Sequence, residues 1–294
     1  MPNRVALLCL VAIAAPTIAD ASRSIAAEPV GLVARVAGAV TLATAEAARR
    51  PVQLFDRLAA GDELATGPQA EVLVVFRSGV RVRLAAGSRA RVAAAGLTTS
   101  VGTAEHLPPL PPLPVIAAVA DAGAAVAAVR VRTGELTLVS PADGLRAAAD
   151  SAVLRFVPAH DGVHDVELED AEGRVVFQAR VSAGRVAVPA DRLAPERRYH
   201  WRVRSHSPAG FRHEGRATFA TLSLAEAKAR AGLLDATTDD ATDLALRAEL
   251  DYALGLWPEA LAGFQRARDR GADAEAVGLR IATLERRLAG SPLP

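Results

Sequence analysis

The chain has 294 residues, a formal net charge of +1 at pH 7 and an aromatic content of 4%. This near-neutral balance argues against nucleic-acid binding, which requires a strong and clustered basic excess. The single cysteine excludes a disulfide within the chain and a metal site built from several thiolates. The length is sufficient for two or three small hydrophobic cores.

Residues 1–27 have the pattern of a bacterial export signal. A short basic start precedes an uninterrupted apolar run over residues 5–15, and Pro16 follows that run. The run is shorter than the ~20 apolar residues that a membrane-spanning helix requires. Small residues at the end of the segment predict cleavage by signal peptidase after Ala21 or after Ala27. We therefore expect a periplasmic protein.

Two further observations concern the mature chain. Cys9 lies inside the apolar run, so cleavage would remove it with the signal and leave a protein without a thiolate. The most apolar later stretch, residues 115–129, is too short to cross a bilayer and carries Asp121. We expect no transmembrane segment after signal cleavage.

Residues 28–107 predict a compact β domain with hairpin connections. Residues 71–76 are apolar on both faces, which is typical of a central strand. Residues 80–84 alternate strictly, with arginines on one face and valines and a leucine on the other. Turn signals separate these strands at Gly61-Asp62, Gly67-Pro68 and Ser78-Gly79.

This region resembles the FecR-type domain of bacterial envelope proteins. The resemblance is carried by Gly38-x-Val40, Leu58 with Gly61-Asp62-x-Leu64-x-Thr66-Gly67, Val72-x-Val74-x-Phe76-x-x-Gly79, and Val82-x-Leu84. One turn departs from the family pattern, because Ser78-Gly79-Val80 stands where Asp-Gly-Ser is usual. The glycines mark tight turns, so the resemblance implies a fold and not an activity.

Residues 108–132 are expected to form a linker. The proline-rich run over residues 108–114 predicts an extended polyproline segment, in which seven residues at about 3.1 Å each hold the neighbouring domains roughly 20 Å apart. The Ala/Val-rich stretch that follows leaves two alternatives, an added strand or a poorly ordered segment.

Residues 133–223 predict a β-sandwich. Strands are expected at residues 135–139, 153–156, 163–169, 175–181, 185–188, 199–204 and 216–221. The run Leu193-Ala194-Pro195-x-x-x-Tyr199-x-Trp201-x-Val203 resembles the tyrosine corner of fibronectin type III-like domains. The resemblance implies that the Tyr199 hydroxyl bonds to upstream backbone, that Tyr199, Trp201 and Val203 face the core, and that His200, Arg202 and Arg204 face solvent.

Residues 224–294 predict helices. Asp239, Asp240 and Thr242 are candidate caps for a helix that runs to about Trp257, and Pro258 would open the next helix. A further helix is expected over residues 274–288, ending at Gly290.

The pattern Gly255-x4-Ala260-x3-Phe264-x2-Ala267, with Ala248 before it, resembles a tetratricopeptide helical hairpin. It departs from that family in two ways: the upstream aromatic is Tyr252, displaced by one position from Asp251, and the closing proline is absent. Because a self-standing solenoid needs about three such units, we expect this one to dock on the sandwich or on a partner.

The strongest candidate for a chemical site is the pair His160 and His164. Two histidines four residues apart lie on one face of a helix, but Pro158 and Gly162 exclude a helix here. We therefore interpret the segment as a polar turn between strands. The sequence predicts no metal or cofactor site.

Nucleophilic catalysis also lacks support. Ser205 and His206 could be combined with an aspartate into a triad, but no strand-turn-helix elbow presents that serine. The paired acids are interpreted structurally, Glu167 with Glu169 as a solvent-facing strand edge and Asp239 with Asp240 as a helix cap. We expect no catalytic residues.

Together these features predict a multidomain, mainly β protein that acts in the envelope as a non-catalytic binding or adaptor protein. Its expected partner is another envelope protein or a peptide. One alternative is a FecR-like signal relay, which requires a cytoplasmic region and a membrane span before the domain, whereas four residues precede the apolar run here. A second alternative is glycan binding with Trp201, Tyr252 or Trp257 as stacking platforms, although such aromatics are more simply core residues.

Overall fold

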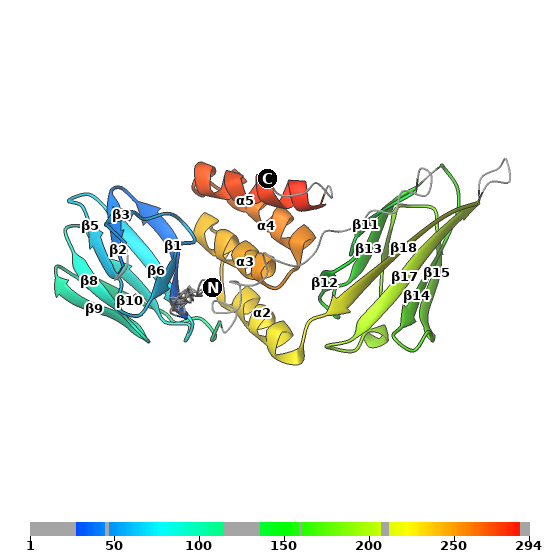
Figure 1. Cartoon of the computed structure of the whole chain (residues 1–294), viewed down its shortest axis with the longest axis horizontal. Helices are drawn as coiled ribbons and strands as arrows, with labels where there is room; N and C mark the ends of the chain where they lie inside the picture. Colours follow the sequence, from blue (N-terminus) through cyan, green and yellow to red (C-terminus); the bar gives the residue numbers. More distant parts are fainter. Residues whose placement is uncertain (1–27, 45–46, 114–135, 159, 207–211, 289–294) are drawn as a thin grey trace, which may run out of the picture.

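The computed structural model describes residues 28–44, 47–113, 136–158, 160–206 and 212–288. The predicted export signal with Cys9, the Ala/Val-rich stretch 115–129 and the expected helix end at Gly290 lie outside the described residues. The described chain forms three units, and the helices lie between the two β units although they come last in the sequence (Figure 1). The predicted class, mainly β with a β-sandwich and a C-terminal helical unit, is confirmed.

The first β unit packs two five-stranded sheets face to face. Its strands are β1 (Pro29–Ala37), β2 (Val40–Ala43), β3 (Arg50–Pro51), β4 (Arg57–Ala59), β5 (Glu63–Thr66), β6 (Glu71–Phe76), β7 (Arg81–Leu84), β8 (Arg89–Ala93), β9 (Gly96–Val101) and β10 (Ala104–Leu107). The sheet orders are β10-β7-β6-β1-β4 and β3-β2-β5-β8-β9. The strand that is apolar on both faces, β6, is central, as predicted.

The second β unit is a sandwich of a five-stranded and a three-stranded sheet. Its strands are β11 (Thr137–Ser140), β12 (Leu145–Ala147), β13 (Val153–Val157), β14 (His164–Asp170), β15 (Val175–Val181), β16 (Arg185–Ala187), β17 (Arg198–His206) and β18 (Arg212–Thr221). The sheet orders are β12-β18-β17-β14-β15 and β11-β13-β16. The sequence missed β12, which pairs in parallel with β18 and is too short to show a period of two.

The tyrosine corner is confirmed in its geometry. The Tyr199 hydroxyl accepts a hydrogen bond from the backbone N–H of Ala194 at 2.7 Å. Along β17, Tyr199, Trp201 and Val203 are buried, whereas His200 is exposed. The buried Trp201 indole donates to the Pro141 carbonyl at 2.8 Å, which satisfies its one donor.

The helical unit consists of α2 (Leu224–Ala236), α3 (Ala241–Ala253), α4 (Trp257–Asp269) and α5 (Ala274–Leu288). Asp240 caps α3 as predicted, because its carboxylate accepts from the Asp243 N–H at 2.9 Å. The predicted end of this helix near Trp257 is wrong: α3 ends at Ala253, and Trp257 is the first residue of α4. Gly255 (φ +76°) adopts a left-handed conformation that terminates the helix.

One hydrophobic core joins all three units. From the first β unit, Leu32, Ala34 and Val75 pack on the helices, and from the sandwich unit Leu145, Ala148 and Leu222 do so. The expectation that the helices dock on the sandwich or on a partner is therefore too narrow, since they dock on both β units. The second apolar face of β6, which carries Val75, packs against the helices.

The proline-rich segment is a structural part of this core, so the prediction of a spacer is wrong for residues 108–113. Leu110 and Leu113 are 5% and 1% exposed. Their N–H groups donate to the carbonyls of Gly79 and Arg77, each at 2.8 Å. Both leucines belong to the hydrophobic core that also contains Val75 and the helices. A Cβ at Gly79 would lie 1.9 Å from the Leu110 carbonyl oxygen, which explains the glycine there.

Candidate functional site

The structure brings the two predicted histidines together at one end of the sandwich. His164 is the first residue of β14 and is fully buried, and its Nδ1 lies 2.5 Å from Ser205 Oγ. The His160 ring is 5.6 Å from that of His164 and 6.0 Å from that of His213, measured between centroids. The polar-turn interpretation is thus wrong for His164, which is a buried strand residue.

The proton positions in this cluster follow from its hydrogen bonds. His160 Nδ1 lies 2.8 Å from the Asp161 carbonyl, which can only accept, so Nδ1 carries a proton. The Nε2 atoms of His160 and His164 are both buried without a hydrogen-bond partner. Burial, and then the neighbouring His160, lowers the pKa of His164, which is therefore neutral at pH 7.

This cluster does not assemble a triad. The Ser205 hydroxyl bonds to His164. Both Ser205 and His164 are fully buried in paired strands, so no substrate carbonyl can reach the hydroxyl. Within the residues that the structure describes, no three or more His, Cys, Asp or Glu side chains are grouped so that they could hold a metal ion.

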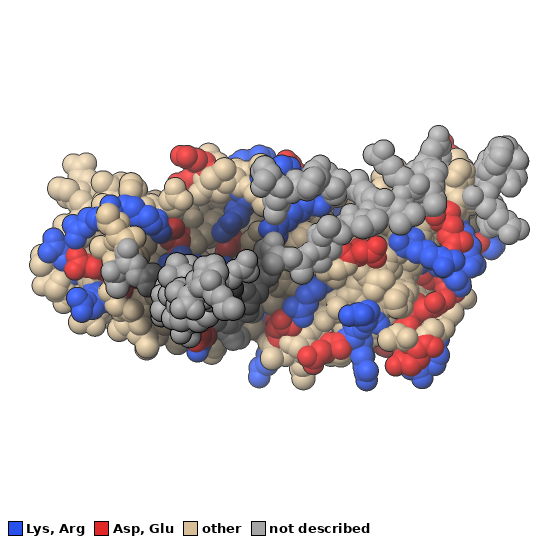
Figure 2. All heavy atoms as spheres, viewed as in Figure 1, with Lys and Arg blue, Asp and Glu red and all other residues tan. Residues whose placement is uncertain are grey.

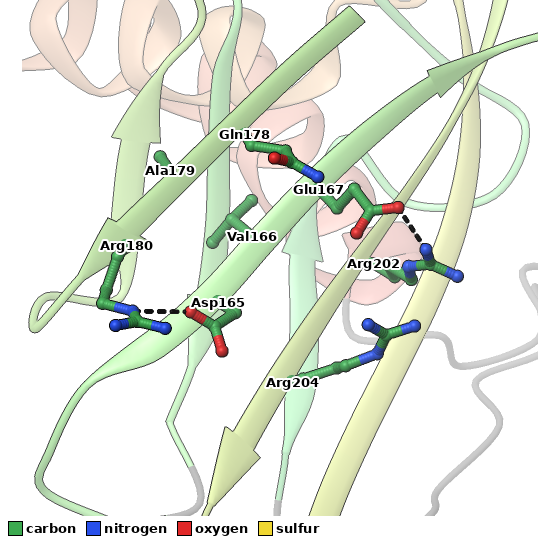
Figure 3. Close-up of a pocket in the computed structure, with 8 residues that line it drawn as sticks. All are labelled: Asp165, Val166, Glu167, Gln178, Ala179, Arg180, Arg202 and Arg204. Carbon is green, nitrogen blue, oxygen red and sulfur yellow. Dashed lines mark hydrogen bonds and ion pairs between the residues drawn. The ribbon is translucent and has the colours of Figure 1, made fainter. Parts of the chain in front are cut away.

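The outer face of the large sandwich sheet carries a shallow, charged hollow of about 360 Å³ (Figure 3). Arg202 of β17 donates to Glu167 of β14, and Arg180 of β15 donates to Asp165 at 2.8 Å. Burial raises the pKa of Glu167, but the hydrogen bond from Arg202 and the positive charges of Arg202 and Arg204 contribute to a larger combined effect that lowers it. The prediction of a strand edge for Glu167 and Glu169 is wrong, because β14 is paired on both sides.

Opposite charges largely neutralise one another on this face. A second hollow of about 450 Å³ adjoins the first and contains Glu169, His200, Arg202 and Arg216. Arg216 in turn pairs with Glu214 at 2.6 Å. Basic and acidic side chains are interspersed over the visible surface of the sandwich unit in Figure 2. A balanced ladder of this kind produces little net field to attract a charged ligand.

A third hollow, which we call the interdomain groove, lies between the first β unit and α5 and has a volume of about 330 Å³. One wall contains the segment from Val52 to Asp56 with Val36 of β1. The other wall is the first half of α5. Unlike the charged sheet face, this groove combines apolar side chains with an acidic rim, and two distant parts of the chain form it.

The apolar part of the interdomain groove includes Leu279, whose side chain is 64% exposed. The buried stripe of α5 consists of Val277, Ile281 and Leu284, so Leu279 lies off that stripe. Half-buried Leu54 lies on the opposite wall. This leucine outside the helical periodicity was the one sequence signal that could have pointed to the groove.

Arg280 lines the groove and connects α5 to both α3 and the first β unit. Its guanidinium makes two hydrogen bonds to the buried Glu249, each of 2.9 Å, and lies 5.4 Å from the centroid of the Phe55 ring. Phe55 also packs edge-on against Phe264 of α4, with ring centroids 5.7 Å apart. Phe55 has φ +69°, a strained conformation for a bulky residue that the surrounding contacts stabilise.

The acidic rim consists of Asp56, Asp273 and Glu275. Asp56 accepts from Arg50 at 2.7 Å and from the Gln53 N–H at 2.8 Å. Asp273 accepts from the N–H groups of Glu275 and Ala276, each at 3.0 Å, and so caps α5. Because Arg280 pairs with Glu249 and Asp56 pairs with Arg50, the negative charge of the rim comes from Asp273 and Glu275.

The three aromatic residues considered for glycan stacking are not available as platforms. Trp201 and Trp257 are 1% and 7% exposed. The half-buried Tyr252 ring is covered by the guanidinium groups of Arg280 and Arg287, at 5.2 and 5.5 Å from its centroid. Stacking of a sugar requires an accessible ring face, so these residues give no support to glycan binding.

No helix within the described ranges is long and apolar enough to cross a membrane. No protein-family model matches the chain, and no curated protein matches it. The resemblances to FecR-type, fibronectin type III-like and tetratricopeptide families therefore stay predictions.

Two solved structures are similar to parts of the chain. One is described as a cell surface anchoring domain, with 23% identity and a TM-score of 0.21, and the match covers 22% of this chain and 86% of that domain. The other is CopC from Methylosinus trichosporium OB3b, with 24% identity and a TM-score of 0.24, covering 30% of this chain and 93% of that protein. At these scores the similarities carry no argument about function.

Proposed function

We propose that this chain is an exported, envelope-associated binding or adaptor protein without catalytic activity, whose partner is another envelope protein or a peptide. The observation that supports the proposal is the shared core. The helices bury apolar residues of both β units, so one continuous core connects the two ends of the molecule. Such a scaffold can present a binding surface in a defined orientation.

The interdomain groove is the surface that best fits this role. It lies at the junction of two units, where ligand sites preferentially occur. The groove that a tetratricopeptide-like hairpin could offer to a partner is partly filled by the chain itself, since Phe55 packs on Phe264. The space left between the first β unit and α5 is therefore the proposed contact region.

Site-specific photocrosslinking in intact cells tests the adaptor role. A photoreactive amino acid at position 279 should give a discrete crosslinked protein or peptide, because this side chain lies in the groove and is exposed. The matched control is position 224, an exposed leucine of α2 outside the groove. If neither position, nor a scan of the remaining exposed residues, yields a crosslinked partner, the adaptor proposal fails.

Export is tested separately. Mass spectrometry of protein purified from the native cell should show loss of the first 21 or 27 residues, because the signal pattern offers these two cleavage sites. An intact N-terminus together with cytoplasmic fractionation would contradict the envelope assignment.

A further inference from the structure

We infer that the interdomain groove binds a short segment of a partner protein in which an apolar side chain is flanked by Lys or Arg. This inference rests on the proposed binding function and specifies the chemistry of the partner. It is carried by the composition of the groove: apolar walls, a negative rim, and a basic residue whose charge is already paired.

The apolar walls identify one half of the ligand. Leu279 projects from α5 at 64% exposure, and half-buried Leu54 and Val36 lie on the other side of the groove. A single exposed leucine is common on protein surfaces and needs no partner. Here, however, it lines a hollow together with two further aliphatic side chains, an arrangement that suits an inserted aliphatic side chain.

The rim identifies the other half. Two charges of the lining are already paired, Asp56 with Arg50 and the one basic lining residue, Arg280, with Glu249. The carboxylates of Asp273 and Glu275 remain to give the rim its negative charge. An anionic segment would be repelled by these carboxylates, and a cationic one attracted.

The α5 N-terminus does not reverse this preference. Free N–H groups at a helix start favour anions. In α5 the N–H groups of Glu275 and Ala276 already donate to the Asp273 carboxylate, each at 3.0 Å. These two N–H groups are therefore not available to an anionic ligand.

The wall of the groove is also pre-formed. The Asp56 carboxylate accepts from the Gln53 N–H at 2.8 Å, and the Phe55 N–H donates to the Val33 carbonyl at 2.9 Å. The Phe55 side chain is fixed by contacts with Phe264 and Arg280. A wall that is ordered before binding reduces the entropy lost on association.

The test uses the full mature chain and three labelled peptides of equal length on a glycine-serine background. The first alternates arginine with leucine, the second replaces the arginines with glutamates, and the third replaces the leucines with serines. Fluorescence anisotropy at low salt should show binding of the first peptide only, weakening as salt is added because the rim is solvent-exposed.

Variants locate the site. Leu279→Ser and Glu275→Lys should each weaken binding of the arginine-leucine peptide about tenfold, whereas Leu224→Ser and Glu285→Lys should change it by less than about twofold. Leu224 and Glu285 are exposed helix residues outside the groove. Since all four positions are exposed, melting curves should confirm that each variant is folded.

Several outcomes would overturn the inference: no binding of the arginine-leucine peptide up to millimolar concentration, equal binding of the glutamate peptide, or equal effects of groove and control variants. Self-association of the chain that Leu279→Ser abolishes would assign the groove to a second copy and would also overturn it. A partner crosslinked from position 279 through an acidic or uncharged segment would leave the adaptor function standing and reject only this inference.

Discussion

The two five-stranded sheets that flank the helices differ in their outer faces. In the first β unit, the sheet centred on β6 has an outer face with Leu32, Ala34 and Val75, which the helices cover. In the sandwich, the sheet with β14 and β17 has an outer face of paired acids and arginines that stays open to solvent. Both inner faces are apolar. The outer face thus decides whether a sheet becomes a layer in a larger core or a free surface.

The largest expected effect comes from placing a charge on the covered face. Val75→Asp would bury a carboxylate among Leu110, Leu113 and the helices and should cost about 3 to 5 kcal/mol of unfolding free energy. The matched change Gln178→Asp on the open sheet adds a carboxylate opposite Glu167 on a solvated face and should cost at most about 1 kcal/mol. Urea denaturation measures both. Similar losses would mean that the first sheet is not covered in solution.

Next in size is the ion pair below the groove. Arg280→Ala leaves the buried Glu249 without its partner and should destabilise by about 3 to 5 kcal/mol. The exposed pair of Arg180 with Asp165 provides the comparison, because Arg180→Ala should cost about 0 to 1 kcal/mol. Recovery of stability in an Arg280→Met, Glu249→Met double variant would support the buried-charge explanation, and a further loss would contradict it.

The tyrosine corner gives an intermediate effect. Tyr199→Phe removes a hydroxyl that accepts from the Ala194 N–H and should cost about 0.5 to 1.5 kcal/mol, the net contribution of a hydrogen bond that is partly buried. Arg204→Ala on the open face of the same strand should cost at most about 0.5 kcal/mol. Equal shifts of the two denaturation midpoints would count against the corner as a stabilising element.

The smallest expected effects depend on pH and separate the interior of the sandwich from its contact with α2. Burial lowers the pKa of His164, so the unfolded chain binds more protons and stability falls as the pH drops below the ordinary value of 6.5. The pKa of Glu226, which accepts two hydrogen bonds from Arg146, is lowered to about 2 in spite of burial. Its contribution is complete above 4.5 and is lost as the pH falls to about 2.

Variants distinguish these two windows. In His164→Gln, the denaturation midpoint should change less between pH 7 and pH 5.5 but should still fall below pH 4.5. In Glu226→Gln, the midpoint should still fall between pH 7 and pH 5.5 but should change less below pH 4.5. A profile that neither variant changes would show that other groups control the pH dependence.

Within each β unit, most of the fold could be predicted from local sequence patterns. The turns, the central position of β6 and the alternation along β17 were all readable, because a strand shows its buried face as a period of two. The Asp240 cap could also be predicted, because helix capping depends only on residues that are close together in the chain. Periodicity failed to predict strands that are too short to show an alternation, such as the three-residue β12.

The way in which the three units combine was not predictable from these patterns. A strand that is apolar on both faces predicts burial but does not say what covers the second face, and the leucines of a proline-rich run look the same in a spacer and in a core. The pairing of His164 with Ser205 and the groove between Phe55 and α5 join residues far apart in the chain. Such contacts depend on the relative placement of packed elements, which no local periodicity encodes.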